Sequence, residues 1–111
     1  MQKSTAVSAL AALIALMALL VMHENANAAD AQVKIANFTF EPPVLTVKVG
    51  TTVTWVNDDD IPHLVAEKDG KFRSSALDTD EKFSQTFKTP GTVEYFCAIH
   101  PHMTGKIVVE P

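Results

Sequence analysis

Short runs of alternating apolar and polar residues occupy most of the chain after residue 30. A period of two is typical of strands with one buried face, and these runs are rich in the β-branched and aromatic residues that strands prefer. No convincing helical period follows residue 30, although 74–77 is compatible with either a loop or a short helical turn. We therefore expect strands over 33–40, 44–49, 52–56, 82–87, 93–97 and 106–109.

Turn-forming residues separate these runs, among them Pro42-Pro43, Gly50 and Pro90-Gly91. Many short strands divided by turn signals favour an all-β sandwich. Val53 and Trp55 lie two residues apart in one expected strand and share a face, which we assign to the core. The same alternation over 93–97 directs Val93, Tyr95 and Cys97 toward the interior.

The first 28 residues have a different pattern. Lys3 is followed by an apolar run over 6–22 and then by Ala-Asn-Ala at 26–28. A basic start, an apolar stretch and an A-x-A site are typical of a secretory signal peptide. We place cleavage after Ala28, which leaves one domain over 29–111. A retained membrane anchor is the less favoured alternative, because the run is near the lower limit of about 17 residues for a spanning helix.

The sequence contains one cysteine, Cys97, so no disulfide forms within the chain. A domain of this size often depends on a disulfide or a metal for stability, and a free exposed thiol outside the cytoplasm is open to oxidation. A thiolate held on a metal avoids both problems, whereas the alternative is a buried, inert cysteine. The net charge is −4 with or without the first 28 residues. An acidic domain lacks the basic patch that nucleic-acid binding requires.

Three side chains that can bind soft metals recur at every third position over residues 97–103. Cys97 offers a thiolate, His100 an imidazole and Met103 a thioether. A cysteine, two histidines and a weak axial methionine form the ligand set of a blue-copper electron-transfer site. His63, which follows Pro62, is the candidate for the second histidine.

These motifs resemble those of the small type I copper proteins, the cupredoxins. The resemblance rests on the segment 50–57, the Pro62-His63 pair, and 91–97 followed by the spacing Cys-x-x-His-x-x-Met. Within this family the short spacing is most similar to that of the amicyanins. The resemblance covers about residues 33–111 and implies a Greek-key β-sandwich of about eight strands. It also implies one type I copper ion per chain.

The resemblance assigns a role to each ligand. Cys97 binds as the thiolate, His63 and His100 bind as neutral imidazoles, and Met103 is the weak axial ligand. The ordinary alternatives are a surface or capping role for His63 and a core-filling role for Met103. His102 lies between two expected ligands, and we expect it to face solvent without binding the metal. A more specific hypothesis is that His102 modulates the docking of a partner protein or the reduction potential of the copper.

Two positions depart from the family pattern. Leu64 and Ala98 stand where cupredoxins usually carry an asparagine after the first histidine and often a serine or threonine after the cysteine. The polar tie between the two ligand segments is therefore absent, although the Leu64 N–H can still reach the sulfur. Pro101 has no N–H to donate, so we expect few hydrogen bonds to the thiolate and a lowered reduction potential.

We expect a periplasmic one-electron carrier that cycles between Cu(I) and Cu(II), and not an enzyme, because no open coordination position is evident. The alternative is a periplasmic copper-binding or delivery protein with an exchangeable site. The resemblance implies redox protein partners, with a quinoprotein amine dehydrogenase as donor and a c-type cytochrome as acceptor. We expect a monomer without stable membrane insertion after cleavage.

Two features around the expected ligands bear on docking. Apolar residues flank them and form a collar around His100: Ile61, Pro62, Ile99 and Pro101. The acidic run over 58–60 is either a solvated turn or a patch that steers a basic partner.

Overall fold

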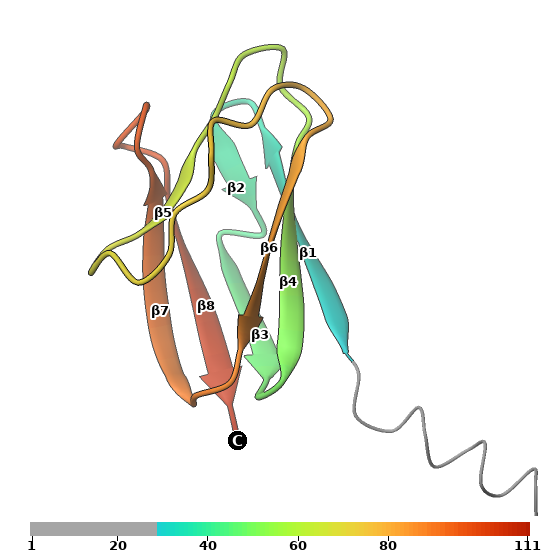
Figure 1. The fold of residues 1–111 in the computed structure, drawn as a ribbon, viewed down its shortest axis with the longest axis vertical. Helices are drawn as coiled ribbons and strands as arrows, with labels where there is room; N and C mark the ends of the chain where they lie inside the picture. The colour runs from blue at the N-terminus through green and yellow to red at the C-terminus, as the bar shows by residue number, and fades with distance from the viewer. Residues whose placement is uncertain (1–28) are drawn as a thin grey trace, which may run out of the picture.

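Eight strands form two four-stranded sheets that face one another across the core (Figure 1). The computed structural model describes residues 29–111, so the signal peptide expected over 1–28 lies outside the described residues. The all-β sandwich of about eight strands is confirmed. Within 29–111 there is no helix, and hence none long and apolar enough to cross a membrane. The strands are β1 (Asp30–Ala36), β2 (Thr39–Glu41), β3 (Val44–Lys48), β4 (Thr51–Asn57), β5 (Val65–Glu67), β6 (Lys82–Phe87), β7 (Gly91–Cys97) and β8 (Thr104–Glu110).

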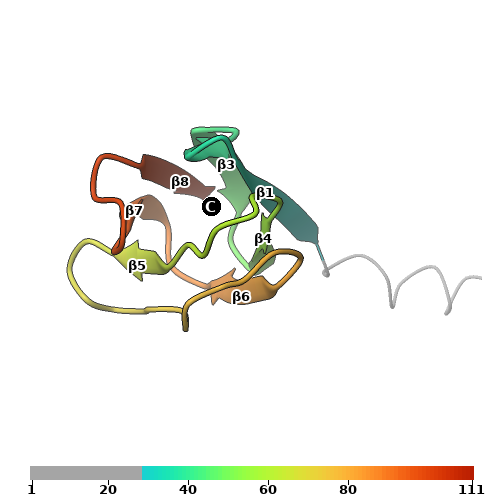
Figure 2. The same ribbon diagram turned by 90° about the horizontal axis from the view of Figure 1, so that it is seen from above.

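The sheets have the strand orders β2-β1-β4-β6 and β3-β8-β7-β5. The pairs β1–β4 and β3–β8 are parallel, and the other neighbours are antiparallel. Figure 2 shows the strands from above, arranged around a common interior. Because successive strands such as β2, β3 and β4 alternate between the sheets, the connecting loops cross the two ends of the sandwich.

The core lies between the sheets and centres on Trp55 in β4, which is fully buried. Its indole ring packs against the rings of Phe72, Phe83, Phe87 and Tyr95, at centroid distances between 5.2 and 6.4 Å. Aromatic side chains bury large apolar areas and contribute strongly to core stability. The assignment of Val53 and Trp55 to the core is confirmed, since neither is exposed.

The strand expected over 33–40 is interrupted, and this prediction was wrong. Asn37 and Phe38 form a turn between β1 and β2, with φ angles of 52° and 60°. The buried residues change from odd to even positions across the turn, with Ile35 before it and Phe40 after it. Phe38 is therefore turned outward, and 51% of its surface is exposed. The sequence shows the same change, because the apolar residues move from odd positions (33 and 35) to even positions (38 and 40), and this change indicates a turn.

The segment 74–77 was open between a loop and a short helical turn, and the structure shows a loop. Two isolated β-bridges hold this part of the chain, one between His63 and Leu77 and one between Ala66 and Arg73. Gln85 shares the inward face of β6 with Phe83 and Phe87 by alternation, but it lies partly exposed because β6 is at the edge of its sheet. Its amide therefore has access to water.

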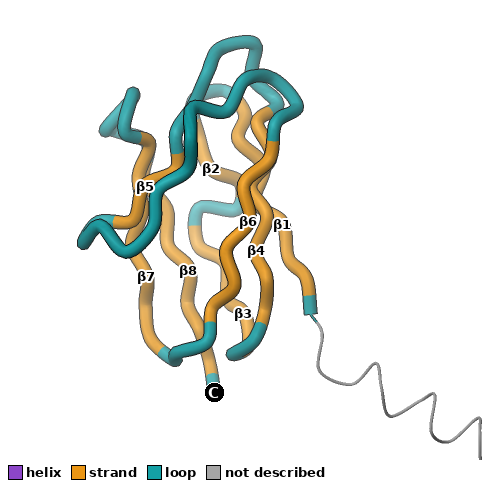
Figure 3. Tube along the Cα trace, viewed as in Figure 1, coloured by secondary structure: helices purple, strands orange, loops and turns teal. Residues whose placement is uncertain are grey.

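Four loops meet at the end of the sandwich away from the C-terminus, at the top of Figure 1. They are the β1–β2 turn, the β4–β5 and β7–β8 loops, and the segment 77–81 before β6; loops are teal in Figure 3. The four expected metal ligands lie in or beside these loops: His63, Cys97, His100 and Met103. The fold thus gathers candidate ligands that are far apart in the sequence.

Tyr95 and Gly105 oppose one another on β7 and β8. The Tyr95 ring lies over the Gly105 Cα, so that a Cβ added at position 105 would collide with the ring and hydroxyl. Within 29–111, the Tyr95 hydroxyl and the Trp55 indole nitrogen are buried without a hydrogen-bond partner. Burial raises the pKa of Tyr95 to about 12, although the nearby Trp55 N–H acts weakly in the opposite direction.

We predict that stability falls in alkali because of Tyr95. Its protonated form is favoured by folding, so this contribution is complete below the unfolded pKa of about 10 and is lost as pH rises through about 12. The change corresponds to roughly 2–3 kcal/mol. Denaturant unfolding at increasing pH measures it, and phenolate absorption reports Tyr95 alone because the sequence has one tyrosine. Tyr95→Phe should remove this slope, and an equal slope in the variant would contradict the assignment.

Candidate metal centre

Cys97 is the last residue of β7, and its side chain is fully buried at the end of the sandwich. Strand alternation places Cys97 on the same inward face as Tyr95, as expected. Its sulfur accepts a hydrogen bond from the backbone N–H of Leu64, at an N–S distance of 3.4 Å. The sulfur is therefore held inside the protein and beside the β4–β5 loop.

His63 approaches Cys97 from the β4–β5 loop and is also fully buried. Its backbone pairs with Leu77 through two hydrogen bonds, of 3.0 Å from the His63 N–H and 2.7 Å to the His63 carbonyl. The imidazole Nδ1 lies 3.7 Å from the Cys97 sulfur. The alternative of a surface role for His63 is thus excluded by its burial.

The β7–β8 loop brings His100 to the same sulfur. The Cys97 N–H donates to the Met103 carbonyl, the His100 N–H to the Cys97 carbonyl and the Met103 N–H to the His100 carbonyl, at 3.0, 3.2 and 2.9 Å. These bonds fold the loop tightly, and the His100 Nδ1 lies 3.7 Å from the sulfur. His100 is partly exposed and Met103 is buried, whereas His102 faces solvent as predicted.

The donor atoms of His63, Cys97 and His100 lie within 4.8 Å of one another. A metal bound about 2.3 Å from sulfur and about 2.0 Å from nitrogen, at an angle between tetrahedral and trigonal, separates the two donor atoms by about 3.5–3.7 Å. The observed sulfur–nitrogen separations match this range. One thiolate and two imidazoles form a soft donor set that suits copper. The residues therefore fit a copper ion.

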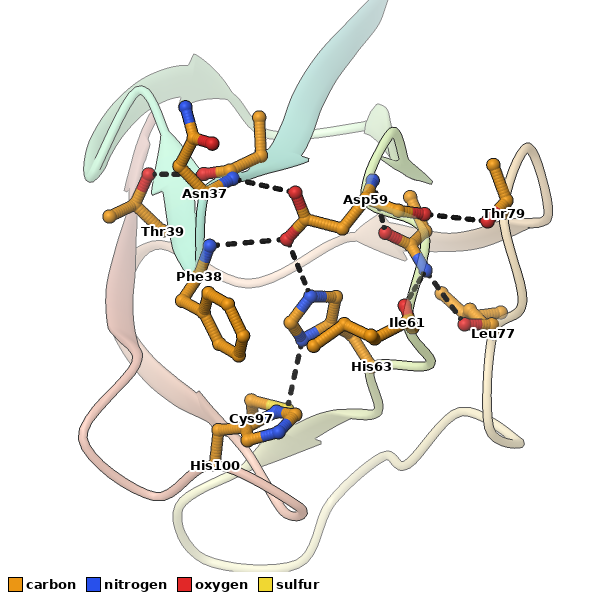
Figure 4. A network of polar contacts seen from close by, with 12 residues as sticks. Asn37, Phe38, Thr39, Asp59, Ile61, His63, Leu77, Thr79, Cys97 and His100 are labelled. Carbon is orange, nitrogen blue, oxygen red and sulfur yellow. Dashed lines mark hydrogen bonds and ion pairs between the residues drawn. The ribbon is translucent and has the colours of Figure 1, made fainter.

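Asp59 organises the surroundings of His63, as Figure 4 shows. Its carboxylate accepts hydrogen bonds from the backbone N–H groups of Asn37 and Phe38 at 2.7 and 3.1 Å. The same carboxylate lies 2.7 Å from the His63 Nε2. Since an ionised carboxylate can only accept, the proton sits on Nε2 and the lone pair of Nδ1 is directed at the site.

The protonation state of Asp59 follows from these contacts. Burial acts to raise the pKa of the Asp59 carboxyl, but the hydrogen bonds from Phe38, Asn37 and His63 outweigh it and lower the pKa below its usual value. Asp59 is therefore ionised at neutral pH, as its role as a triple acceptor requires.

Asn57 fixes the start of the same loop from a fully buried position at the end of β4. Its side-chain amide donates to the carbonyls of Ile61 and Leu77, at 2.8 and 2.9 Å. Its side-chain oxygen accepts from the backbone N–H of Asp59 at 2.9 Å. Asn57 thus connects the loop that carries His63 to the segment before β6.

The two ligand segments are joined through the backbone at the positions that depart from the family pattern. The Ala98 N–H donates to the Leu64 carbonyl at 3.0 Å, next to the bond from the Leu64 N–H to the Cys97 sulfur. Within 29–111 that Leu64 N–H is the one backbone donor to the sulfur, which agrees with the expectation of few such bonds. Backbone pairing therefore supplies a tie that the missing polar side chains would have made.

Sequence reasoning missed three residues of this site. Asp59 was interpreted only as part of an acidic run, although its spacing of four residues from His63 was visible. Asn57 was noted only as part of the segment 50–57, yet its side chain holds the loop. Phe38 was assigned to a strand, yet its ring packs against both imidazoles. The predicted residues His63, Cys97 and His100 are brought together.

Comparisons with known proteins agree with this geometry. A family model described as a cupredoxin-like domain matches residues 9–109. Amicyanin-alpha of Methylorubrum extorquens is 38% identical over 92 residues, which are 78% of this chain and 77% of that protein. A solved Cu(I) form of an amicyanin variant superposes with a TM-score of 0.67 and 40% identity, covering 73% of this chain and 82% of that one.

A larger copper protein also contains a similar module. The copper-containing nitrite reductase of Thermus scotoductus superposes with a TM-score of 0.69 and 33% identity. The match covers 74% of this chain but 22% of the reductase. The shared part is therefore one portion of a much longer enzyme.

We predict that Asp59→Asn destabilises the metal-free protein by about 1–3 kcal/mol at neutral pH, because charge-assisted hydrogen bonds are lost. The lowered pKa means that this contribution is present above the unfolded pKa of about 3.9 and disappears as pH falls through the folded value. Urea unfolding from neutral to acid pH should show a slope that the variant lacks. The exposed neighbour provides a control, since Asp60→Asn should change stability by less than about 0.5 kcal/mol.

Proposed function

The chain belongs to the cupredoxin-like family, and on that premise we propose that it carries single electrons in the periplasm at one type I copper ion. The proposed ligands are His63, Cys97, His100 and Met103. The observation that supports this most directly is the convergence of one sulfur and two imidazole nitrogens within 4.8 Å. Bound copper supplies the change between Cu(I) and Cu(II), and the protein supplies a fixed set of donors.

Each of the three close ligands is anchored by contacts that do not involve a metal. The Cys97 sulfur accepts from Leu64, His63 donates to Asp59, and the His100 backbone is held within the β7–β8 loop. Donors already in place need little rearrangement when the charge on the ion changes, which favours rapid electron transfer. Preorganisation of this kind also favours retention of the ion.

Copper delivery is the second candidate function. Delivery requires ligands that can leave the ion readily, and His100 is the exposed member of the set. The burial of His63 and Cys97 and the hydrogen bonds around them favour a retained ion and hence the carrier.

Catalysis is not part of this proposal. A catalytic metal keeps a coordination position free for substrate, whereas His63 and Cys97 are fully buried and Met103 is 5% exposed. The similarity to a copper nitrite reductase concerns 22% of that enzyme. The similarity to amicyanin instead supports a carrier.

Electrons would enter and leave at His100, the ligand that reaches the surface. Apolar residues surround it, with Ile99 and Phe38 exposed by 46% and 51%. The collar expected from Ile61, Pro62, Ile99 and Pro101 therefore also includes Phe38. Small apolar contacts suit transient electron-transfer complexes.

Charge is concentrated beside this collar in two acidic segments, 58–60 and 78–81, which hold six carboxylates. Thr79 Oγ1 donates to the Asp59 carbonyl at 2.6 Å and the Asp80 N–H to the Asn57 carbonyl at 2.7 Å, so the segments lie side by side. With Lys34 and Lys82, which lie beside them, these segments carry a net charge of −4. The remaining six acidic and six basic residues of 29–111 cancel one another. The whole net charge thus lies at this edge.

This distribution favours basic redox partners, because a concentrated charge orients an approaching protein. The similarity to amicyanins supports a quinoprotein amine dehydrogenase as donor and a c-type cytochrome as acceptor. A periplasmic location agrees with the signal peptide expected over 1–28. We propose that the protein acts there as a monomer.

We predict that the protein loaded with one equivalent of Cu(II) shows an intense visible charge-transfer band and a narrow copper hyperfine splitting. Both signs report a strong copper–thiolate bond, so Cys97→Ser should abolish the band. His102→Ala is the matched control, since His102 is exposed and should leave the spectrum unchanged. A weak band and wide splitting in the unmodified protein would contradict the type I assignment and favour delivery.

Electron-transfer kinetics should depend on the acidic segments. With a basic c-type cytochrome, the bimolecular rate should fall as ionic strength rises, because salt screens exposed charges beyond about 10 Å at 0.1 M. Asp58→Asn combined with Asp60→Asn should lower the low-salt rate about two- to fivefold. Glu110→Gln, at the end of β8, is the control and should have little effect. Identical salt slopes in the double variant and the control would exclude steering by these segments.

A further inference from the structure

The two imidazoles are held in place by different interactions. The His63 ring is fixed by its hydrogen bond to the Asp59 carboxylate. Within residues 29–111, the His100 Nε2 has no hydrogen-bond partner, and the ring instead contacts two aromatic neighbours. These are Phe38, at a centroid distance of 5.1 Å and an angle of 84°, and His63, at 5.1 Å and 62°. Orientation of the partly exposed His100 ring therefore depends on packing.

Phe38 is in an unusual position for a phenylalanine. Its φ angle is 60° and half of its surface is exposed. A bulky side chain rarely adopts a positive φ, and such strain persists only where the surrounding structure enforces it. The exposed ring also gains little from burial. Neither backbone preference nor core packing explains why a phenylalanine stands here.

The inner side of the Phe38 ring supplies an explanation. The ring meets His100 nearly perpendicularly at 5.1 Å and meets His63 at 5.7 Å and 87°. Edge-to-face contacts at these distances are favourable. Among residues 29–111, Phe38 is thus the one phenylalanine, tyrosine or tryptophan whose ring contacts both imidazoles of the candidate centre.

We propose that Phe38 is a positioning residue that keeps the His100 ring turned toward the Cys97 sulfur. Phe38 offers no donor atom to the centre, and it acts through its ring contact with the His100 imidazole. The proposal rests on the proposed copper site for its functional meaning. The contacts themselves are present in the protein without a metal.

The Asp59 carboxylate, which orients the His63 ring, also influences the His100 ring indirectly. Asp59 accepts from the backbone N–H of both Asn37 and Phe38, which holds the two left-handed residues of the turn. Asp59 also accepts from the His63 ring. One side chain thus orients His63 directly and His100 through Phe38.

Two substitutions of Phe38 separate its effect on the His100 ring from its effect on the stability of the strained turn. Phe38→Asn removes the ring and relieves the left-handed strain, because asparagine tolerates positive φ. Thermal stability should therefore be equal or higher in this variant. Phe38→Tyr keeps the ring and the strain, and serves as the matched conservative control.

The first readout uses the metal-free protein. Fast motions of the histidine rings are measured by carbon-13 relaxation at about pH 8, where an ordinary imidazole is neutral. The His100 ring should be ordered in the parent and in Phe38→Tyr, and mobile in Phe38→Asn. The His63 ring should stay ordered in all three proteins, because Asp59 holds it.

The second readout is the capture of Cu(I) from the loaded protein by an excess of a competing chelator. Loss of an aromatic contact should accelerate capture about three- to tenfold in Phe38→Asn, with Phe38→Tyr unchanged. Unchanged His100 order and capture rate in Phe38→Asn would overturn the proposal. So would equal loosening of His63 and His100 accompanied by a lower melting temperature, which would indicate a general structural role.

Failure of the copper assignment gives a different result. It would appear in the parent protein as a missing thiolate band with Cu(II). The ring dynamics of the metal-free protein would still decide whether Phe38 holds His100.

Discussion

The candidate centre depends on one interaction, the three hydrogen bonds that the Asp59 carboxylate accepts. Two backbone N–H groups and one imidazole N–H converge on it. The interaction closes the β1–β2 turn against the β4–β5 loop and sets which nitrogen of His63 is free to bind a metal. A neutral acceptor would make weaker bonds, because charge-assisted hydrogen bonds are roughly twice as strong. Ionisation of Asp59 is thus a structural requirement of the site.

The sandwich contributes rigidity on the other side of the centre. Cys97 ends a strand that is paired with both β5 and β8, and the loop after it is closed by backbone bonds. The sulfur position is therefore set by sheet hydrogen bonds, whereas the imidazole positions are set by loop contacts. This division leaves the candidate ligand His100 partly exposed at the surface, whereas His63 and Cys97 are buried away from water.

Much of this arrangement could be predicted because it is local in the sequence. Alternation identified the inward faces of β4 and β7, and the spacing of Cys97, His100 and Met103 indicated a soft-metal site. The loop contacts could not be found in the same way. Asp59 meets Asn37 and Phe38 across more than 20 residues, and such a contact depends on which loops share one end of the fold. The interrupted strand at Phe38 was missed because apolar residues on both sides of the turn resemble one longer run.

The close approach of Tyr95 to Gly105 has a consequence for how this sequence can diverge. An aromatic ring at position 95 occupies the space that any side chain at position 105 would need. Substitutions at the two positions are therefore coupled. A larger residue at position 105 on β8 is tolerated only after Tyr95 on β7 has been replaced by a smaller residue. Since position 95 lies two residues before Cys97 on the same face, this paired constraint reaches the strand that delivers the sulfur. Evolutionary change in the strand that carries Cys97 is thus constrained by Gly105, which is not one of the candidate ligands.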